Sequence, residues 1–393
     1  MTALAALPAR SIVRAIADAA ARWSDADFPA RVRATQRVAE RTGYSVPVVE
    51  YAFDRLFFSI TQDALTATIE DELGGLEILD EFMPRQGRTE AWAQPAGNVC
   101  VISSRTTIGV GLPAAIFALC AKCDVLVKDR EDSLIAAFFE TLVDENEGFR
   151  SAARAEAWSS NDNEIPDLRS FDAVVAFGRD ETLELIRSAL KPEARFVALG
   201  SRASAGYITR EALSDRPAAK AIARGAARDL VLYETEGCLS LHVLFAENGG
   251  HVSVTEFSTL LEQEIETANV EFPRGTAGND QSARVAQARA LAAFRSATSI
   301  PAPTVETPQF LPRVLGAIPV DNPAQALDYL QRHGVPLEGF AIAGNRDDVT
   351  ALALAAGAVR LSAFGELQHP PLHGNHGGRP RIADFVKWID KTF

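Results

Sequence analysis

Several features are scarce or missing in this sequence of 393 residues, and each argues against a class of protein. Lysine and arginine (39) are outnumbered by aspartate and glutamate (52), which leaves a formal net charge of −13 at pH 7. A chain with that negative excess is a poor partner for nucleic acid or for an anionic membrane surface. The longest apolar stretch, residues 108–119, is shorter than the roughly 20 residues of a membrane-spanning helix. We therefore expect a soluble, cytoplasmic protein with no nucleic-acid or membrane partner.

Cysteine is scarce as well, since the chain has only four, too few for a disulfide framework in a protein of this length. Cys120 and Cys123 form a C-x-x-C pair inside an apolar helical run, and no second ligand pair follows, so we interpret both as packing residues. The histidines of the tail, His369, His373 and His376, lack cysteine or acidic neighbours at ligand spacing. The sequence therefore predicts no metal site.

What the chain has in quantity is apolar residues, at 47%, which is ample for two or three domains. Residues 1–80 have helical patterns, and from residue 98 short apolar strands alternate with helices. The expected elements are 99–102, 112–121, 125–128, 172–178, 181–190 and 195–200. That alternation predicts a parallel, doubly wound, Rossmann-like sheet in a first domain at 1–200.

A second α/β layer is expected after residue 200. Its predicted strands are 229–234, 239–245, 314–320, 340–343 and 359–364, and its predicted helices are 254–270, 324–333 and 347–356. A tail rich in proline, glycine and histidine follows, with a last helix ending at Phe393. The fold class is thus α/β with two domains, the second at 201–365, and a C-terminal tail and helix at 366–393.

Cys238 is the residue with the clearest chemical potential. It follows Gly237 at a break between two strand-like runs, where a thiol can lie exposed in a loop. A thiolate is well suited to take an acyl group from a thioester. A lone cysteine is more often a small buried hydrophobe, and only the α/β units upstream favour the nucleophile. His242 would lie about 13 Å from Cys238 along an alternating strand, too far for an ion pair, so we interpret it as structural.

Two strand ends carry groups that suit a dinucleotide. Lys128 ends one strand and Glu131 follows three residues later, where both can reach ribose hydroxyls, although the solvated start of a helix explains them equally well. Gly178 closes another strand, and Arg179 to Thr182 begin a helix whose free N–H groups suit a phosphate. Arg179 can add a bidentate contact. The G-x-G-x-x-G fingerprint is absent.

Together these segments resemble the aldehyde dehydrogenase superfamily and, within it, the acyl-CoA reductase family that includes the fatty-acid reductase of bacterial luminescence. Residues 96–99 resemble the first nucleotide-binding strand, 126–131 the Lys-x-x-Glu ribose-binding turn, 176–182 with 195–208 the second unit, and 236–238 the nucleophile segment. The resemblance covers roughly residues 40–393. It implies a Rossmann-like cofactor domain beside a catalytic domain of aldehyde dehydrogenase type, a homo-oligomer, and a catalytic Cys238. It also implies NADPH or NADH, held by Ile102, Ser103, Lys128, Glu131, Gly178, Arg179, Thr182 and Phe310.

The departures from the superfamily pattern are informative. Ala198 stands where hydrolytic members have the glutamate that activates water, so the acyl group should pass to a thiol or a hydride instead. The oxyanion-hole amide has Arg105 or Thr106 in its place, and a lost donor typically costs about 100- to 1,000-fold in rate. The backbone N–H of Cys238 and the Arg105 guanidinium are the expected substitutes. Pro308 and Gln309 replace the ribose carboxylate, and Phe310 is left to stack there.

The sequence therefore predicts NAD(P)H-dependent reduction of an acyl thioester, carried by CoA or an acyl carrier, to an aldehyde through an acyl-Cys238 intermediate. Glu131 favours NADH because it repels a 2′-phosphate, whereas the resemblance favours NADPH, so the choice stays open. Two alternatives remain, a Cys-dependent acyltransferase or thioesterase without nicotinamide, and a degenerate, non-catalytic partner subunit. We also expect Cys238 to be the only reactive thiol of the four, with a lowered pKa.

Overall fold

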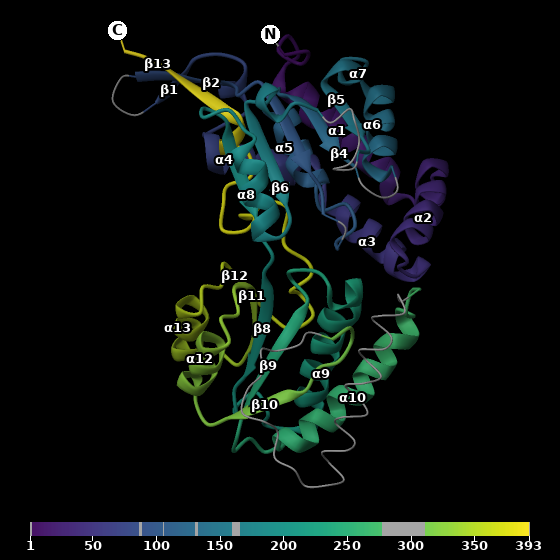
Figure 1. The fold of residues 1–393 in the computed structure, drawn as a ribbon, viewed down its shortest axis with the longest axis vertical. Coiled ribbons are helices and arrows are strands. Elements are labelled where there is room, and N and C mark those ends of the chain that lie inside the picture. Colours follow the sequence, from purple (N-terminus) through teal and green to yellow (C-terminus); the bar gives the residue numbers. More distant parts are fainter. Residues whose placement is uncertain are drawn as a thin grey trace. The chain divides into compact units, whose positions relative to one another are not determined.

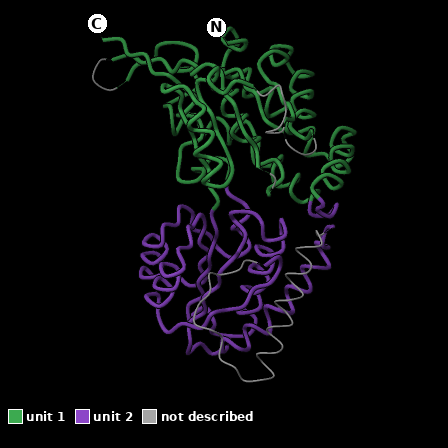
Figure 2. Tube along the Cα trace, viewed as in Figure 1, with its two compact units in different colours: residues 1–42, 49–201, 371–393 green, residues 43–48, 202–370 purple. Residues whose placement is uncertain are grey.

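The protein forms two compact units, each assembled from separate stretches of the chain (Figure 2). A computed structural model describes residues 2–85, 89–104, 106–129, 133–158, 166–276 and 311–392. Unit 1 comprises Met1–Thr42, Val49–Ser201 and Pro371–Phe393, and unit 2 comprises Gly43–Val48 and Arg202–Pro370. Three of the predicted site residues, Arg105, Glu131 and Phe310, lie outside the described residues.

Unit 1 begins with the expected helices, α1 (Ala9–Ser24), α2 (Pro29–Thr42), α3 (Val46–Ser59) and α4 (Gln62–Leu73). Trp23 of α1 is fully buried, and its ring lies 5.0 Å from that of Phe57 and 6.2 Å from that of Phe138. Its indole N–H donates to the Thr141 hydroxyl at 2.9 Å. Burying aromatic rings supplies much of the hydrophobic stabilisation here, and the polar N–H keeps a partner.

The central sheet of unit 1 is parallel, with strand order β5-β4-β3-β6-β7. Its strands are β3 (Asn98–Ile102), β4 (Asp124–Lys128), β5 (Ala153–Glu156), β6 (Ala173–Phe177) and β7 (Arg195–Leu199). The helices that alternate with them are α5 (Leu112–Cys120), α6 (Leu134–Glu145), α7 (Phe149–Ala152) and α8 (Asp180–Ser188) (Figure 1). The predicted doubly wound sheet is confirmed. Cys120 and Cys123 are buried, as expected of packing residues.

A separate antiparallel sheet was not predicted. It pairs β1 (Met83–Arg85), β2 (Thr89–Pro95) and β13 (Val386–Lys391), which lie side by side in Figure 1. The predicted last helix is therefore wrong, because the end of the chain is a strand. Val386, Trp388 and their polar neighbours alternate along the chain, and β2 supplies the backbone partners that decide for a strand.

Unit 2 contains a second parallel sheet with strand order β10-β9-β8-β11-β12, which confirms the second α/β layer. Its strands are β8 (Ala203–Ile208), β9 (Leu241–Glu247), β10 (Ala317–Val320), β11 (Leu337–Ala343) and β12 (Arg360–Ser362). Its helices are α9 (Arg216–Val231), α10 (Val254–Glu271), α12 (Pro323–Arg332) and α13 (Asp347–Ala355). Figure 1 shows α9 and α10 on one side of the sheet and α12 and α13 on the other. No helix among the described residues is long and apolar enough to cross a membrane.

The strand predicted at 229–234 is wrong. Asp215 caps α9 by accepting from the Ala218 N–H, and the helix continues through Val231 into the 3-10 turn η3 (Leu232–Thr235). The apolar residues Leu230 and Val231 are the buried side of a helix and not a strand, a distinction that short apolar runs do not carry. β9 pairs with β8, which was missing from the predicted strands, and with β10, which falls within the strand predicted at 314–320.

Candidate functional site

Cys238 lies in the turn between η3 and β9 and is half-buried, whereas Cys100, Cys120 and Cys123 are buried. The carbonyl oxygen of Cys238 accepts a hydrogen bond from the Ser204 hydroxyl at 2.8 Å. The same hydroxyl oxygen accepts from the Gly339 N–H at 3.0 Å. Two neighbouring strands, β8 and β11, therefore fix the backbone that carries the thiol.

The expectation of a lowered thiol pKa is wrong. Burial raises the pKa of Cys238 to about 12, and the negative charge of Glu338 raises it further. Hydrogen bonds from the backbone of Cys238 and Leu239 and the positive charge of Arg202 act in the opposite direction but are weaker. A half-exposed position in a turn thus did not imply a well-solvated sulfur. At neutral pH the residue is a thiol, and nucleophilic chemistry requires that it lose a proton when substrate binds.

The backbone just before Cys238 is unusual. Tyr233, Glu234 and Thr235 have φ values of 53°, 52° and 64°, which places three successive side chains in the left-handed region. Each such residue costs about 1–2 kcal/mol unless it is glycine, so surrounding contacts must hold the turn. Strain of this kind concentrates at functional sites. Nothing in the local sequence indicates it, because glycine is absent at all three positions.

His242 lies on β9 with its ring between two backbone groups. Nδ1 accepts from the Ser204 N–H at 3.2 Å, and Nε2 is 3.0 Å from the Thr235 carbonyl oxygen, to which it donates. This pairing requires the neutral ring, and burial lowers the pKa of His242 to about 4. The histidine therefore ties the left-handed turn to β8, which agrees with the structural role expected for it.

The sheet of unit 1 brings several of the predicted cofactor residues to one edge. Ile102, at the end of β3, pairs with Lys128 at the end of β4 and with Ala176 of β6. Ser103 follows β3 directly, and its N–H bonds the Lys128 carbonyl oxygen. Ligands of open parallel sheets bind beyond these carboxyl ends. Lys128 also places its ammonium 5.3 Å from the centre of the Trp158 ring.

The β6–α8 corner holds the remaining predicted residues. Gly178 follows β6 and its N–H bonds the Leu199 carbonyl oxygen, while Arg179 stands exposed at the position before α8. Thr182 is exposed in the first turn of that helix. Asp180 and Glu181 occupy the same turn, and their charges oppose the attraction of the helix end for a phosphate. The two carboxylates therefore weaken the helix dipole as a phosphate site at this corner, and Arg179 is its exposed positive charge.

Ala198, the residue in place of a water-activating glutamate, lies on β7 opposite Ala176 and is exposed. An alanine side chain offers no group to accept a proton from water. Among the described residues, no group of three or more histidine, cysteine or acidic side chains is arranged to hold a metal ion.

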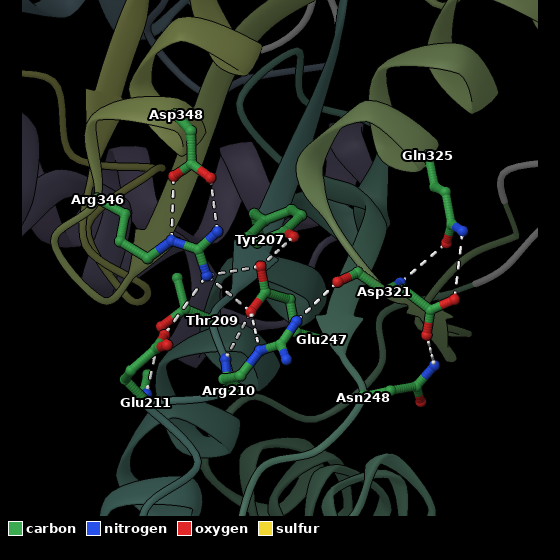
Figure 3. Close-up of polar contacts among 11 residues, drawn as sticks. Tyr207, Thr209, Arg210, Glu211, Glu247, Asn248, Asp321, Gln325, Arg346 and Asp348 are labelled. Carbon is green, nitrogen blue, oxygen red and sulfur yellow. Dashed lines mark hydrogen bonds and ion pairs between the residues drawn. The ribbon is translucent and has the colours of Figure 1, made fainter.

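The carboxyl edge of the unit 2 sheet, where a ligand would ordinarily be sought, is filled by an ionic network (Figure 3). Glu247, at the end of β9, is fully buried and accepts from the Tyr207 hydroxyl at 2.6 Å, from the Arg210 Nε at 3.0 Å and from Arg346 at 2.8 Å. Arg346 also pairs with Asp348 at 2.6 Å. These side chains satisfy one another and join the ends of β8, β9 and β11. Sequence reasoning missed this network, whose members are far apart in the chain.

Comparison with known proteins gives the same family as the sequence resemblance. A family model described as acyl-CoA reductase (LuxC) matches residues 4–388. A long-chain acyl-protein thioester reductase of Aliivibrio fischeri is 22% identical over 273 residues, which cover 67% of this chain and 54% of that protein. A second such reductase, from Photobacterium leiognathi, is 22% identical over 273 residues and is covered to 55%. The chain thus spans about half the length of these curated relatives.

Solved structures show the fold. An NAD-dependent benzaldehyde dehydrogenase from Corynebacterium glutamicum superposes with a TM-score of 0.68 at 13% identity, covering 99% of this chain and 87% of that one. An acetylating aldehyde dehydrogenase from Geobacillus thermoglucosidasius gives 0.68 at 14% identity, with 100% and 92% covered. The predicted aldehyde dehydrogenase type of α/β architecture is confirmed.

Proposed function

Since the chain belongs to the acyl-CoA reductase (LuxC) family, we propose that it reduces a long-chain acyl thioester to an aldehyde through an acyl group on Cys238. The observation that carries the proposal is the state of the four thiols. Cys238 alone is half-exposed, in a turn that Ser204 and His242 fix, whereas the other three are buried. The names of the curated relatives support a thioester as substrate, with CoA or an acyl carrier as the thiol that leaves.

The chemistry at Cys238 follows from its surroundings. The sulfur loses its proton, forms a bond to the thioester carbonyl carbon, and the carrier thiolate leaves and takes up a proton. A reduced nicotinamide, when bound, would supply a hydride to the acyl carbon. The carbon–sulfur bond to Cys238 would then break and release the aldehyde, and the Cys238 thiolate would take up a proton from solvent, which regenerates the thiol. Glu338, whose charge acts on the sulfur, is our proposed acceptor of the first proton, and Arg105 our proposed partner of the carbonyl oxygen.

The missing base at Ala198 determines the fate of the acyl group. Without a side chain that activates water, the acyl-Cys238 thioester should persist until a thiol or a hydride reaches it. This favours reduction over hydrolysis. It is also the feature that separates the proposed reductase from a thioesterase.

A nicotinamide dinucleotide fits the residues at the carboxyl edge of the unit 1 sheet. We propose that Ile102, Ser103 and Lys128 contact it beyond β3 and β4, and that Gly178, Arg179 and Thr182 do so beyond β6. A Cβ built on Gly178 would lie 3.8 Å from the Thr182 side chain, an ordinary contact distance, and the exposed Arg179 beside it supplies a positive charge for a phosphate. Glu131 and Phe310 complete the proposed set, and the choice between NADPH and NADH stays open. The superfamily resemblance supports a homo-oligomer, and the composition supports a cytoplasmic location.

The experiment follows the acyl group by intact mass. Incubated with hexadecanoyl-CoA and no cofactor, the protein should gain one acyl group, and Cys238→Ser should gain none. NADPH or NADH should discharge the group as hexadecanal, and free CoA should return acyl-CoA. Rapid release of hexadecanoic acid with CoA would replace the reductase by a thioesterase. If no acyl group is gained, or if neither nicotinamide discharges it, the reductase proposal is wrong.

A further inference from the structure

Three residues of the turn before Cys238 have a backbone conformation that glycine adopts at the lowest energetic cost. Tyr233, Glu234 and Thr235 are all left-handed, with φ between 52° and 64°, whereas the neighbouring Gly237 is not in that region. Left-handed backbone is accessible to glycine at little cost but is strained for other residues. The turn therefore has this shape because something outside it holds it there.

The strongest hold comes from Arg313, about 80 residues further along the chain. Its guanidinium Nη2 donates to the Glu234 carboxylate at 2.7 Å, and its backbone N–H donates to the Thr235 hydroxyl oxygen at 2.9 Å. Two of the three left-handed residues are thus bound by one residue. Arg313 is itself left-handed, with φ 56°.

The side chain of Arg313 is fully buried, so its charge interacts strongly with the Glu234 carboxylate and requires such a partner. Its Nη1 donates to the Asn269 side-chain oxygen at 2.8 Å and to the Phe272 carbonyl oxygen at 2.6 Å, so the guanidinium also anchors the end of α10. A buried charge with a matched partner is costly to leave unpaired. The arginine therefore transmits the position of α10 to the turn.

The other side of Cys238 is fixed independently. Ser204 of β8 binds the Cys238 carbonyl oxygen, and His242 binds the Thr235 carbonyl oxygen. The backbone of Cys238 is therefore held on one side by the strained turn and on the other by β8. A nucleophile displaced by about 1 Å from its productive position can lose a hundredfold in rate.

From these contacts we infer that Arg313 is a positioning residue for the nucleophile. It holds Tyr233–Thr235 in the left-handed conformation through Glu234 and Thr235, and so places the Cys238 sulfur against the substrate carbonyl. The inference rests on the proposed role of Cys238. We assign Arg313 no contact with substrate or cofactor, and we propose that it acts only through the turn.

The test compares acyl transfer with plain reactivity of the thiol. In Arg313→Gln, the rate of acyl-Cys238 formation from hexadecanoyl-CoA should fall roughly tenfold to a hundredfold. Iodoacetamide labelling of Cys238 at neutral pH should instead become faster, because the sulfur leaves its half-buried position and becomes more accessible to the reagent. Cys100, Cys120 and Cys123 should stay unlabelled, which distinguishes this change from general unfolding. Arg313→Lys should be intermediate, since it keeps the charge but fewer donors.

A second pair of variants isolates the backbone conformation. Glycine at position 234 adopts the left-handed conformation without the Arg313 contacts, whereas alanine does not. In the Arg313→Gln background, Glu234→Gly should therefore restore most of the acyl transfer, and Glu234→Ala should not. Both doubles remove the same two charges, so only the conformational account predicts a difference between them. Arg332→Gln is the matched control, because it removes an exposed ion pair with Asp328 on α12 of the same unit, away from α10 and the turn.

Three outcomes would overturn the inference: acyl transfer in Arg313→Gln within about twofold of the wild type, equal rates in the two doubles, or an equal loss in Arg332→Gln. If Arg313→Gln does not fold, Glu234→Gln provides the alternative test, because it removes the negative charge that pairs with Arg313 and leaves the Arg313 contact to Thr235 in place. It should slow acyl transfer by a smaller factor, and an unchanged rate overturns the inference. If the wild type takes no acyl group, the proposed function fails. The role of Arg313 is then judged by labelling alone: an unchanged rate of Cys238 labelling in the Arg313 variants would refute it.

Discussion

A single neutral ring, that of His242, makes the turn at Cys238 sensitive to acid. Burial lowers the pKa of His242 to about 4, compared with about 6.5 in an unfolded chain. The unfolded state therefore binds the proton first, so this contribution to stability is complete above pH 6.5 and is lost as the pH falls toward 4. The loss should be on the order of 3 kcal/mol over that interval.

His242→Gln should flatten this part of the pH dependence, because an amide can serve the Ser204 N–H and the Thr235 carbonyl oxygen without titrating. Urea unfolding at several pH values between 4 and 7 measures the difference from the wild type. His251→Gln, at an exposed position in the same unit, serves as the control and should keep the wild-type slope. Parallel curves for wild type and His242→Gln would show that the ring does not control stability in this range.

At the scale of the element, the patterns that could be read from the sequence were the local ones. β3, β4, β6 and β7, with α5 and α8, follow a short apolar alternation, and each was predicted close to its observed bounds, whereas α6, α7 and β5 were not predicted. β13 was assigned to a helix because the partner that makes it a strand, β2, lies about 300 residues away. The apolar run before Cys238 was wrongly assigned to a strand for a different reason: periodicity does not separate a short strand from the end of a buried helix.

The candidate site divides along the same line. Cys238, Lys128 and Gly178 could be selected from the sequence because their residue types and places beside strands carry meaning. The lowered thiol pKa was wrong because desolvation depends on what packs over the sulfur. Arg313, Ser204 and the left-handed turn were not foreseen. Their contacts join segments 34 to 135 residues apart, and no local pattern encodes them.

The strand ends of unit 2 give a prediction about elements. Burial would raise the pKa of Glu247, but hydrogen bonds from Tyr207, Arg210 and Arg346 outweigh it and hold the pKa below its usual value. A lowered carboxyl pKa contributes stability that is present above the unfolded pKa of about 4.3 and is lost as the pH falls through the folded value. Glu247→Gln leaves two arginines without their buried partner and should cost about 3–5 kcal/mol near neutral pH.

Urea unfolding at pH 7 and at pH 3 tests this assignment, since the difference between wild type and Glu247→Gln should shrink in acid. Asp328→Asn is the matched control, because it removes an exposed ion pair with Arg332 in the same unit and should cost at most about 1 kcal/mol. Equal costs for the two variants would mean that the network does not bind the ends of β8, β9 and β11 together.

At the scale of the whole molecule, the N-terminal and C-terminal segments both belong to unit 1. Residues from Pro371 onward belong to unit 1, although they follow unit 2 in the chain. The Glu72 carboxylate of α4 accepts from the N–H groups of Arg381, Ile382 and Ala383 at 2.6, 2.8 and 3.0 Å. Ile382 is fully buried, and β13 completes the small sheet beside β2. The C-terminal segment is thus a structural part of the unit that we propose binds the cofactor.

Truncation after Pro370 should therefore destabilise unit 1 and spare unit 2. Hydrogen exchange should show lost protection in β2, which loses the partner strand β13, and in α4, which loses the three N–H groups at Glu72. β8 and β9, with the Cys238 turn, should keep their protection, since their hydrogen bonds lie within residues 202–370.

Glu72→Gln should reproduce part of the effect of the truncation, because a neutral amide binds the N–H groups less strongly than a carboxylate. Glu77→Gln removes only the exposed pair with Arg10 and should leave exchange unchanged. Faster exchange in β8 and β9 than in β2 would show that the C-terminal segment supports unit 2 instead.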